Sequence, residues 1–394
     1  MTAVTEGGDG KLRLPYWFSA AHLCIDWPFG AVYVIAPVMA AAFGWSPAQV
    51  GLLLTLQSVV AAVAYIPAGL LMDRVSNRGR VLAMTFFWVV AGYLLASTAG
   101  SFWPLALLMA MAAIGDAAWH PMATGILVKS APDKRAKVLG IHAIGGSLAV
   151  VLAPLSTGYL LEFVDWRTAF QLILVPTLVM GALILFYVGP RMPRVALDRA
   201  VSVDLKLLWR QWSTPFALML VLMMVLYNLG QVGAMAMMPL YLKGTLGFDI
   251  SQTGLAFAAV LLVGALIQPW VGQASDRIGR RPVIAMSCAL AAAGGVAVFL
   301  ADGPVLALLG LTVCTGALTG VRSTVLACAV DLSGQSESTT MGVAFAVMDG
   351  IGAMGALIAG LVGEVELSRA FLMAAVCAGG AGTIALILKG WGGR

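Results

Sequence analysis

Residues 246–282 read "LGFDISQTGLAFAAVLLVGALIQPWVGQASDRIGRRP", a long apolar run between a polar turn and a cluster of arginines. The run from 250 to 272 is long enough to cross a bilayer as a helix, which takes about 20 residues. A helix is the expected structure because it satisfies its own backbone hydrogen bonds where lipid offers none.

A similar stretch occurs 203 positions earlier, where residues 43–74 read "FGWSPAQVGLLLTLQSVVAAVAYIPAGLLMDR". Six positions are identical at this offset: Gly44/Gly247, Gln49/Gln252, Gly51/Gly254, Gly69/Gly272, Asp73/Asp276 and Arg74/Arg277. Both stretches begin with a predicted capping box, Ser46 with Gln49 and Asp249 with Gln252. An internal repeat of apolar segments is typical of transporters, whose substrate site lies near the middle of the membrane between the halves.

Composition extends this interpretation to the whole chain. The 394 residues are 61% hydrophobic and 10% charged, whereas soluble proteins average about 25% charged residues. The apolar segments are too long and uniform for the alternating strands of an outer-membrane barrel. We count twelve predicted spans: about 15–43, 48–72, 80–99, 104–128, 137–161, 168–189, 215–241, 250–272, 282–301, 304–330, 339–363 and 369–389.

The predicted fold class is therefore an all-α membrane protein with two six-helix bundles related by the repeat. The polar stretch from Arg191 to Trp212 is the clearest interruption of the apolar pattern. We predict an N-terminal bundle at 1–190, a cytoplasmic linker at 191–212 and a C-terminal bundle at 213–394.

The charge distribution predicts the orientation. With the N-terminus inside, 19 of the 23 Lys and Arg residues fall at the termini, in the even-to-odd connections or at their edges. The exceptions are Arg167, Lys243, Arg369 and Arg322. This is the positive-inside pattern, which places both termini in the cytoplasm of a cell with the chain in its inner membrane. The net charge of +5 is thus explained by topology and does not indicate nucleic acid.

The sequence shows no pattern typical of an enzyme or of a metal centre. The five cysteines all lie in apolar segments and form no CxxC pair, which is typical of small buried side chains. We find no nucleophile–base motif, metal cluster or nucleotide-binding loop. We expect no cofactor and no metal; the expected partners are a small-molecule substrate, protons and the lipid bilayer, with a monomer as the default.

Polar residues inside the spans are candidates for function, because burying them costs free energy. Three aspartates lie near the middle of a span: Asp26, Asp116 and Asp349. His22 precedes Asp26 by four positions and His120 follows Asp116 by four, which puts each pair on one helix face. Such pairs can exchange protons near neutral pH. The alternative is interhelical hydrogen bonding without transport of protons, and for Asp349 function and packing are equally open.

Arg322 is the one basic residue well inside a span. Its guanidinium could bind a carboxylate or phosphonate group of a substrate in bidentate fashion. The alternative is an internal partner such as Asp349 or Asp331. Trp27 and Trp119 could stack on a flat or cationic substrate or simply pack. The candidate substrate-binding residues are Arg322, Trp27, Trp119, Asn228, Gln231 and His142.

The connection at 272–282, "GQASDRIGRRP", resembles the signature loop of the major facilitator superfamily. That resemblance implies a latch for one state of the transport cycle, although a simple basic loop would also satisfy topology. The first copy, "GLLMDRVSNRGR", has Ser76 and Asn77 where the second has Gly279 and Arg280. The expected latch residues are Gly69, Asp73, Arg74, Gly272, Asp276, Arg277, Gly279, Arg280 and Arg281.

The fifth span resembles the glycine-rich fifth helix of facilitator antiporters. It contributes Gly145, Gly146, Pro154 and Gly158, with Ala153 where such helices usually have glycine before the proline. Glycines permit close helix approach and proline bends a helix. This favours export.

A narrower resemblance, carried by the first half, is to the fosmidomycin-resistance type of facilitator exporters. "AHLCIDWPFGAVYVIAP" and "WHPMATG" are similar to runs of that group, with Met122 where the group often has Glu after His-Pro. The resemblance implies drug or metabolite efflux in exchange for protons, and Asp116 is the candidate to replace the missing glutamate. Two alternatives remain at this point: an importer or uniporter of an organic anion, and a sensor with the same fold that does not transport.

Overall fold

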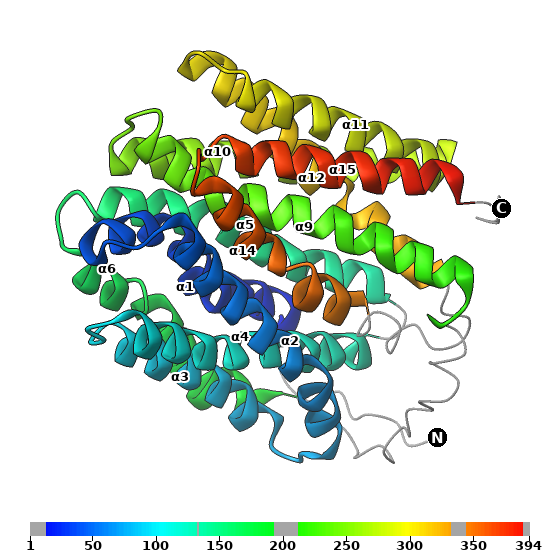
Figure 1. Cartoon of the computed structure of the whole chain (residues 1–394). Helices are drawn as coiled ribbons and strands as arrows, with labels where there is room; N and C mark the ends of the chain where they lie inside the picture. The colour runs from blue at the N-terminus through cyan, green and yellow to red at the C-terminus, as the bar shows by residue number, and fades with distance from the viewer. Residues whose placement is uncertain (1–12, 132–133, 193–211, 332–343, 389–394) are drawn as a thin grey trace.

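The computed structural model describes residues 13–131, 134–192, 212–331 and 344–388, and these residues form helices and their connections, with no strand among them. Within this part of the chain, twelve helical segments are long and apolar enough to cross a membrane (Figure 1). This confirms the prediction of twelve helical spans.

The helix bounds follow the predicted spans closely. The first half contains α1 (Leu14–Phe43), α2 (Pro47–Arg74), α3 (Arg78–Ala96), α4 (Phe102–Ser130), α5 (Arg135–Leu160), and a sixth span made of α6 (Trp166–Leu172), α7 (Val175–Leu183), η2 (Ile184–Val188) and η3 (Gly189–Arg191). The second half contains α9 (Pro215–Gly244), α10 (Ile250–Ile278), α11 (Arg280–Phe299), α12 (Pro304–Asp331), an eleventh span made of η4 (Ala346–Ile351) and α14 (Met354–Gly363), and α15 (Arg369–Ile387). Most of the predicted linker at 191–212 lies outside the described residues.

Both predicted capping boxes are present. The Ser46 side chain accepts a hydrogen bond from the Gln49 backbone at 3.4 Å, and the Asp249 side chain accepts one from the Gln252 backbone at 2.7 Å. The Gln252 bond is also the main reason that the pKa of Asp249 lies below its ordinary value. Gly44 and Gly247 precede the boxes with φ of 68° and 72°, a backbone conformation that favours glycine. The two copies of the repeat therefore make the same turn.

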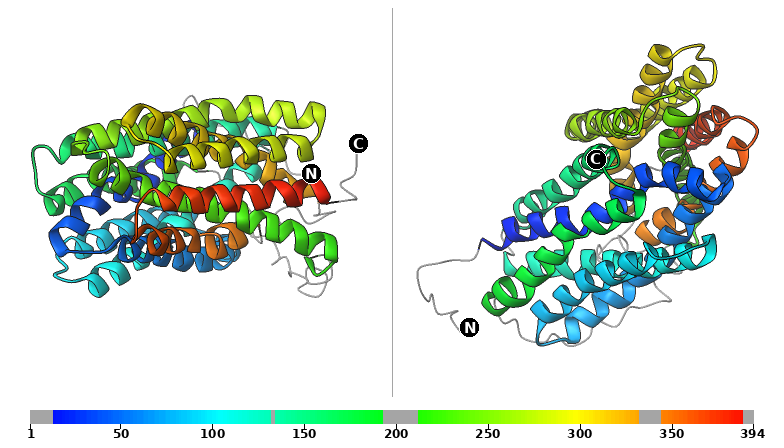
Figure 2. Two further views of the ribbon diagram at one scale, coloured as in Figure 1. Left: turned by 45° about the horizontal axis from the view of Figure 1, so that its top comes forward. Right: turned by 90° about the vertical axis from the view of Figure 1, so that its left-hand side faces the viewer.

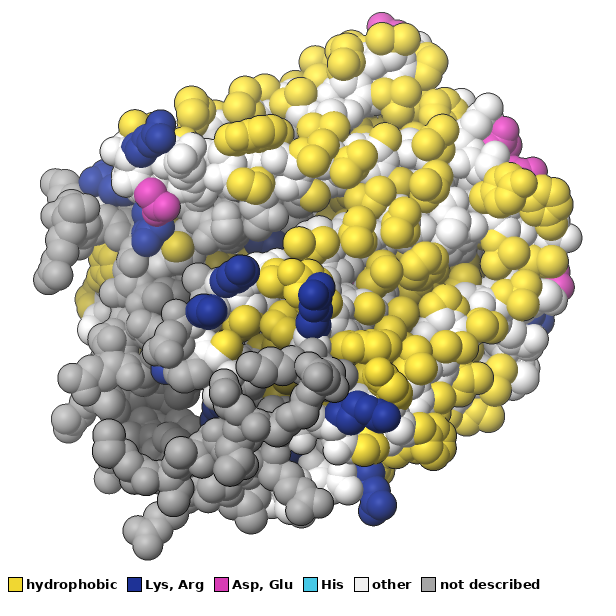
Figure 3. Space-filling view, turned by 180° about the vertical axis from the view of Figure 1, so that it is seen from behind, with side chains coloured by type: hydrophobic (Ala, Val, Ile, Leu, Met, Phe, Trp, Pro, Cys, Tyr) yellow, Lys and Arg dark blue, Asp and Glu magenta, His cyan; other side chains and the backbone are white. Residues whose placement is uncertain are grey.

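Charged residues separate the molecule into two ends. One end contains the connections 44–46, 97–101, 161–165, 245–249, 300–303 and 364–368, and we call it the closed end. We call the opposite end the basic end. Six exposed acidic residues lie at the closed end, namely Glu162, Asp165, Asp249, Asp302, Glu364 and Glu366, and among the described side chains Asp276 is the exposed acidic residue at the basic end. Basic residues lie at the basic end: Arg74, Arg80, Lys129, Lys134, Arg135, Lys137, Arg191, Arg277, Arg280 and Arg281. Figure 3 shows a broad apolar surface between the two ends, as expected of a surface in contact with lipid.

Two of the basic residues that break the positive-inside pattern have local partners at the closed end. Arg167 donates to the Ser97 carbonyl just after α3, and its guanidinium lies 4.3 Å from the centre of the Trp166 ring. Arg369 lies 3.8 Å from Glu366. Arg167 thus caps a helix C-terminus, where a cation is favoured, and its position has a structural reason.

The two halves meet along two seams, α2 against α14 and α5 against α10. Figure 2 shows the halves side by side in two further views. A Cβ added to Gly254 would lie 2.9 Å from the Gly158 Cα, and one added to Gly51 would lie 2.9 Å from the Leu357 Cα. Gly51 and Gly254 are matched positions of the repeat, so the repeat marks where helices of opposite halves approach closely.

The eleventh span is broken at Gly352 and Ala353, between η4 and α14. Thr55 of α2 donates to the Ala353 carbonyl at 3.0 Å and accepts from the Leu357 amide at 3.1 Å. Backbone groups freed inside a membrane protein must find other partners. Here the opposite half supplies them, so the break is held by the seam.

Thr55→Val is expected to weaken the closed end. The variant keeps the shape of the side chain and removes both hydrogen bonds to the eleventh span. Interhelical hydrogen bonds in membranes average about 0.6 kcal/mol each, so losing two of them should raise the population in which the closed end is open roughly eight-fold. The rate of maleimide labelling at Val50→Cys, a buried position on α2, measures this in a chain without its native cysteines.

Thr312→Val is the matched control, because among the described residues the Thr312 hydroxyl bonds the Leu308 carbonyl of its own helix and no other group. That variant should label at the parent rate. An unchanged rate in Thr55→Val would show that these two bonds do not hold the seam.

Candidate functional site

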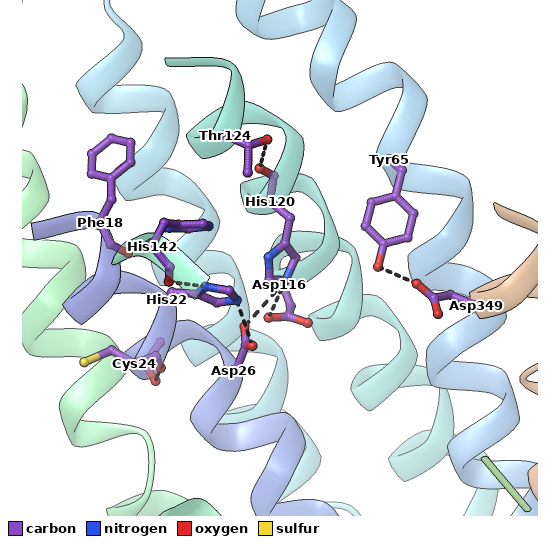
Figure 4. A network of polar contacts seen from close by, with 11 residues as sticks. Phe18, His22, Cys24, Asp26, Tyr65, Asp116, His120, Thr124, His142 and Asp349 are labelled. Atoms are coloured by element: carbon purple, nitrogen blue, oxygen red, sulfur yellow. Dashed lines mark hydrogen bonds and ion pairs between the residues drawn. The ribbon is translucent and has the colours of Figure 1, made fainter. Parts of the chain in front are cut away.

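The histidines and two of the three predicted aspartates form one cluster in the first half (Figure 4). His22 and Asp26 come from α1, Asp116 and His120 from α4, and His142 from α5. The two i, i+4 pairs predicted on separate helices therefore contact each other. The structure brings into one group what the sequence presents as two pairs and a candidate substrate residue.

His120 lies between the two carboxylates. Its Nε2 atom is 3.5 Å from Asp26 Oδ1 and 3.9 Å from Asp116 Oδ1. His22 Nε2 is 3.2 Å from the other oxygen of Asp26. Both Oδ1 atoms are buried and have no hydrogen-bond partner among the described residues. The carboxylates are thus connected through one imidazole nitrogen.

His142 supports the cluster from behind. Its backbone carbonyl lies 3.0 Å from His22 Nδ1, and the two imidazole rings stack with centres 4.3 Å apart. The His142 ring itself faces the Phe18 carbonyl, with Nδ1 at 3.3 Å. Its side chain is buried, which favours a role in positioning His22 over the substrate contact expected from the sequence.

Gly145 and Gly146 allow α5 to approach α1 at His22. A Cβ on Gly146 would lie 2.6 Å from both Cε1 and Nε2 of His22, and one on Gly145 would lie 2.9 Å from His22 Cβ. The absence of side chains at these two positions leaves room for the imidazole ring. These glycines of the antiporter-like motif therefore pack directly against the cluster.

The missing glycine of that motif is compensated on the facing helix. A Cβ on Gly30 would lie 3.0 Å from the Ala153 Cβ, so α1 provides the small residue that α5 lacks. The Pro154 carbonyl and Gly158 both face Gly254 across the seam. This part of the fifth helix thus packs against the other half.

Trp27 and Trp119 are candidates from the sequence either for stacking on a substrate or for packing. Trp119 is fully buried and its ring lies 5.5 Å from His22 and 5.3 Å from His142, measured between centres. Trp27 is half-buried and packs against the hydrophobic core. In this conformation the geometry favours the packing alternative for both, with Trp119 as a wall of the histidine cluster.

A second charged group lies in the other half and faces the first. Arg322 Nη2 on α12 is 3.6 Å from Asp349 Oδ1, and the Tyr65 hydroxyl of α2 donates to Asp349 Oδ2 at 3.2 Å. The internal partner considered for Arg322 is therefore present; the side chain of Asp331 lies outside the described residues. Sequence reasoning missed Tyr65, because a tyrosine in an apolar span gives no signal distinct from packing.

Asp349 belongs to the π-helix η4, a local distortion that is frequent at functional sites. Asn228 of α9 donates from Nδ2 to the Met348 carbonyl at 2.5 Å, and a Cβ on Gly352 would lie 2.6 Å from that same nitrogen. Asn228 and Gln231 are both buried. Asn228 thus positions the backbone beside Asp349, which differs from the substrate contact expected for it.

A groove of about 570 Å³ opens towards the basic end, between α5, α10 and α12. It is lined by Ser147, Ala265, Gln268, Pro269, Gly272, Gln273, Asp276 and Ser323. Among the described residues, a Cβ on Gly272 would have Ser323 Oγ as its one neighbour within 4 Å, at 3.6 Å, so no helix packs closely against Gly272. The halves are in contact at the closed end and apart along this groove.

The latch residues are consequently spread out. Asp276 is 76% exposed and lies 3.8 Å from Arg280 on the same connection. Gly279 has φ of 93°, a backbone conformation that favours glycine. Arg281 donates to the carbonyls of Ala385 and Leu386 at the end of α15.

In the first copy of the latch, a Cβ on Gly69 would have one neighbour within 4 Å in the part of the chain that the structure describes, Pro121 Cβ at 3.8 Å. Arg74 is exposed, and the Asp73 side chain lies outside the described residues. Arg78 is buried, and its guanidinium nitrogens have no hydrogen-bond partner in the described part of the chain. The first loop therefore differs from the second in structure as it does in sequence.

The spacing within the cluster would also suit a metal ion, since His22, Asp26 and His120 each place one ligand-type atom within 4.8 Å of the others. His22 Nε2 and Asp26 Oδ2 are nevertheless at hydrogen-bond distance, 3.2 Å, so a proton satisfies this pair without any further ligand. A comparison of transport with and without a chelator distinguishes the two occupants.

Comparison with known proteins agrees with this architecture. Residues 18–360 match the family model described as Major Facilitator Superfamily. A Haemophilus influenzae protein named for metabolite transport is 28% identical over 341 residues, covering 83% of this chain and 82% of that protein. A Mycolicibacterium smegmatis protein named as an MFS-type efflux pump is 28% identical over 232 residues, covering 56% of this chain and 52% of that protein.

Solved structures share the fold at low sequence identity. A bacterial homolog of the human lysosomal transporter Spinster, in an inward-facing and occupied conformation, has a TM-score of 0.83 at 18% identity, covering 98% of both chains. The nucleoside transporter NupG has a TM-score of 0.77 at 12% identity, covering 97% of this chain and 100% of that chain.

Proposed function

This chain belongs to the major facilitator superfamily of membrane transporters, and we propose that it exports a small organic molecule across the inner membrane in exchange for protons. One observation carries the proton coupling: two carboxylates, Asp26 and Asp116, each place a buried oxygen atom near the same histidine nitrogen in the middle of the first half. Ionisable groups are expensive inside a membrane and commonly mark proton pathways there.

The direction of transport rests on the charge distribution and on the seams. If the basic end faces the cytoplasm, as the positive-inside pattern favours, the closed end faces the periplasm and the groove opens inward. An exporter takes its substrate from the cytoplasm in this state. Relatives named for metabolite transport and for efflux support a small organic substrate.

The residues then take distinct roles in alternating access. Asp26 and Asp116 hold protons that entered from the periplasm and release them when the cavity opens to the cytoplasm, and His120 connects the two carboxylates. Arg322 and Asp349 face the first half through Tyr65 and contribute a polar wall for the substrate. Because Arg322 is already paired with Asp349, import of an organic anion is less well supported than export.

Transport in liposomes tests the proposal. With a pH-sensitive dye and an imposed proton gradient, candidate compounds should drive proton movement opposite to their own. Asp116→Asn should lose most of this movement, since an amide cannot release a proton, while its thermal unfolding in detergent stays close to that of the parent.

Asp302→Asn is the matched control, because Asp302 is exposed in a connection at the closed end. Unaltered coupling in both Asp26→Asn and Asp116→Asn would remove the proton path. A chelator should leave transport unchanged; loss that is restored by added metal would instead assign the cluster to an ion.

A further inference from the structure

We infer that the histidine cluster holds two protons of different kinds: a resident proton between His22 and Asp26, and an exchangeable proton that His120 passes between Asp116 and Asp26. This inference rests on the proposed proton coupling and assigns each residue of the cluster to one of the two protons.

The backbone behind His22 determines which nitrogen of its ring carries a hydrogen. The His142 carbonyl lies 3.0 Å from His22 Nδ1, and a carbonyl oxygen can only accept. His22 Nδ1 must therefore carry a hydrogen and donate it. This hydrogen bond sets the tautomer of His22 without any titratable partner, as the second bond of a histidine commonly does.

The opposite side of the same ring faces the Asp26 carboxylate. In neutral His22, Nε2 would be a bare acceptor, yet it lies 3.2 Å from Asp26 Oδ2. An ionised carboxylate is also only an acceptor. Two acceptors at this distance repel each other unless a proton lies between them. One proton thus stays with the pair for as long as the contact holds, on the nitrogen or on the oxygen.

Packing on several sides keeps His22 in this position. Its ring stacks on His142, contacts Trp119, and has two atoms within 2.6 Å of the place where a Cβ on Gly146 would be. Rotation would lose the hydrogen bond to the His142 carbonyl. His22 is thereby enclosed, and His142 and Gly146 act as positioning residues for it.

His120 is placed differently. Its Nε2 atom lies 3.5 Å from Asp26 Oδ1 and 3.9 Å from Asp116 Oδ1. When neutral His120 carries its hydrogen on Nδ1, Nε2 has a free lone pair and can accept the proton of the Asp116 carboxyl group, which breaks an O–H bond and forms an N–H bond. The imidazolium can then give the Nε2 proton to Asp26 Oδ1, which breaks that N–H bond and forms an O–H bond on Asp26, so the number of protons is conserved.

The other titratable groups near the cluster do not take over this role. Tyr93 of α3 accepts from Gln57 at 3.0 Å, and Tyr65 of α2 donates to Asp349. Tyrosines remain protonated near neutral pH. On α5 the facing group is His142, whose Nδ1 faces the Phe18 carbonyl, and the Arg322–Asp349 pair lies beyond Tyr65. The exchangeable proton is thus confined to Asp116, His120 and Asp26.

Solid-state NMR of the full chain in lipid bilayers, with ¹⁵N-labelled histidine, tests the inference without requiring transport. His22 should show a protonated Nδ1 at every pH between about 5 and 8, the range in which histidines ordinarily titrate, whereas His120 should change with pH. Spectra of His22→Gln and His142→Gln assign the signals. A deprotonated Nδ1 in His22, or joint titration of His22 and His120, would overturn the inference.

Transport provides the second measurement. His120→Gln keeps a side chain that can donate but cannot carry a proton, so proton movement should fall at least ten-fold while the His22 signal stays as in the parent. Unreduced movement would remove His120 as the relay. Absence of proton movement in the parent would contradict the proposed function instead, and the NMR result would still report on the resident proton.

Discussion

Gly146→Val is expected to abolish proton-coupled transport. A Cβ at this position would lie 2.6 Å from two atoms of the His22 ring, and valine adds two further methyl groups. His22 would have to leave the His142 carbonyl and Asp26, which removes the resident proton's site. Excess volume in a packed core also costs about 1–3 kcal/mol, so we expect at least a hundred-fold loss of proton movement together with a lower free energy of unfolding.

Gly140→Val on the same helix is the control, because a Cβ on Gly140 meets nothing within 4 Å. Proton movement in liposomes and thermal unfolding should both match the parent there. Adding His22→Ala to Gly146→Val makes room for the valine and should restore stability but not coupling. Coupling at the parent rate in Gly146→Val would mean that the position of His22 does not matter.

The twelve spans, the internal repeat and the two capping boxes could all be predicted from the sequence. Each depends on residues close together in the chain, such as Ser46 with Gln49, or on composition over about 20 residues. The repeat also pointed to Gly51 and Gly254, although their role in the seams follows only from the arrangement of the helices.

The cluster could be predicted only in part. The spacing of His22 and Asp26, and of Asp116 and His120, places each pair on one helix face, but the distance between α1 and α4 depends on packing across the whole bundle. The His142 carbonyl gives no sequence signal, because every residue has one. Thr55 likewise looks like an ordinary residue of an apolar span until the break at Ala353 lies beside it.

The departure from the exporter group at Met122 also has a structural counterpart. Met122 is buried in the hydrophobic core, on the same helix as Asp116 and His120. The carboxylate that approaches the histidines from α4 is that of Asp116, with Oδ1 at 3.9 Å from His120 Nε2. This geometry supports the proposal that Asp116 carries the proton for which the group commonly has a glutamate.

Asp349→Asn is expected to destabilise the second half, because it leaves the Arg322 guanidinium without its counter-ion. Removing one partner of a buried ion pair costs about 3–5 kcal/mol. About a quarter to a third of each side chain is exposed, 31% for Arg322 and 24% for Asp349, so we expect a loss near the lower end, about 3 kcal/mol. Thermal and denaturant unfolding in detergent measure it.

The double variant Arg322→Gln/Asp349→Asn distinguishes lost charge balance from lost shape. It removes both charges, so most of the stability should return. Glu366→Gln is the control, since the Arg369–Glu366 pair is about half exposed and surface pairs contribute about 0–1 kcal/mol. If the double variant is as unstable as Asp349→Asn, the pair does not act through charge. In the stable double variant, equal transport loss for anionic and neutral substrate analogues would then exclude Arg322 as an anion-binding residue.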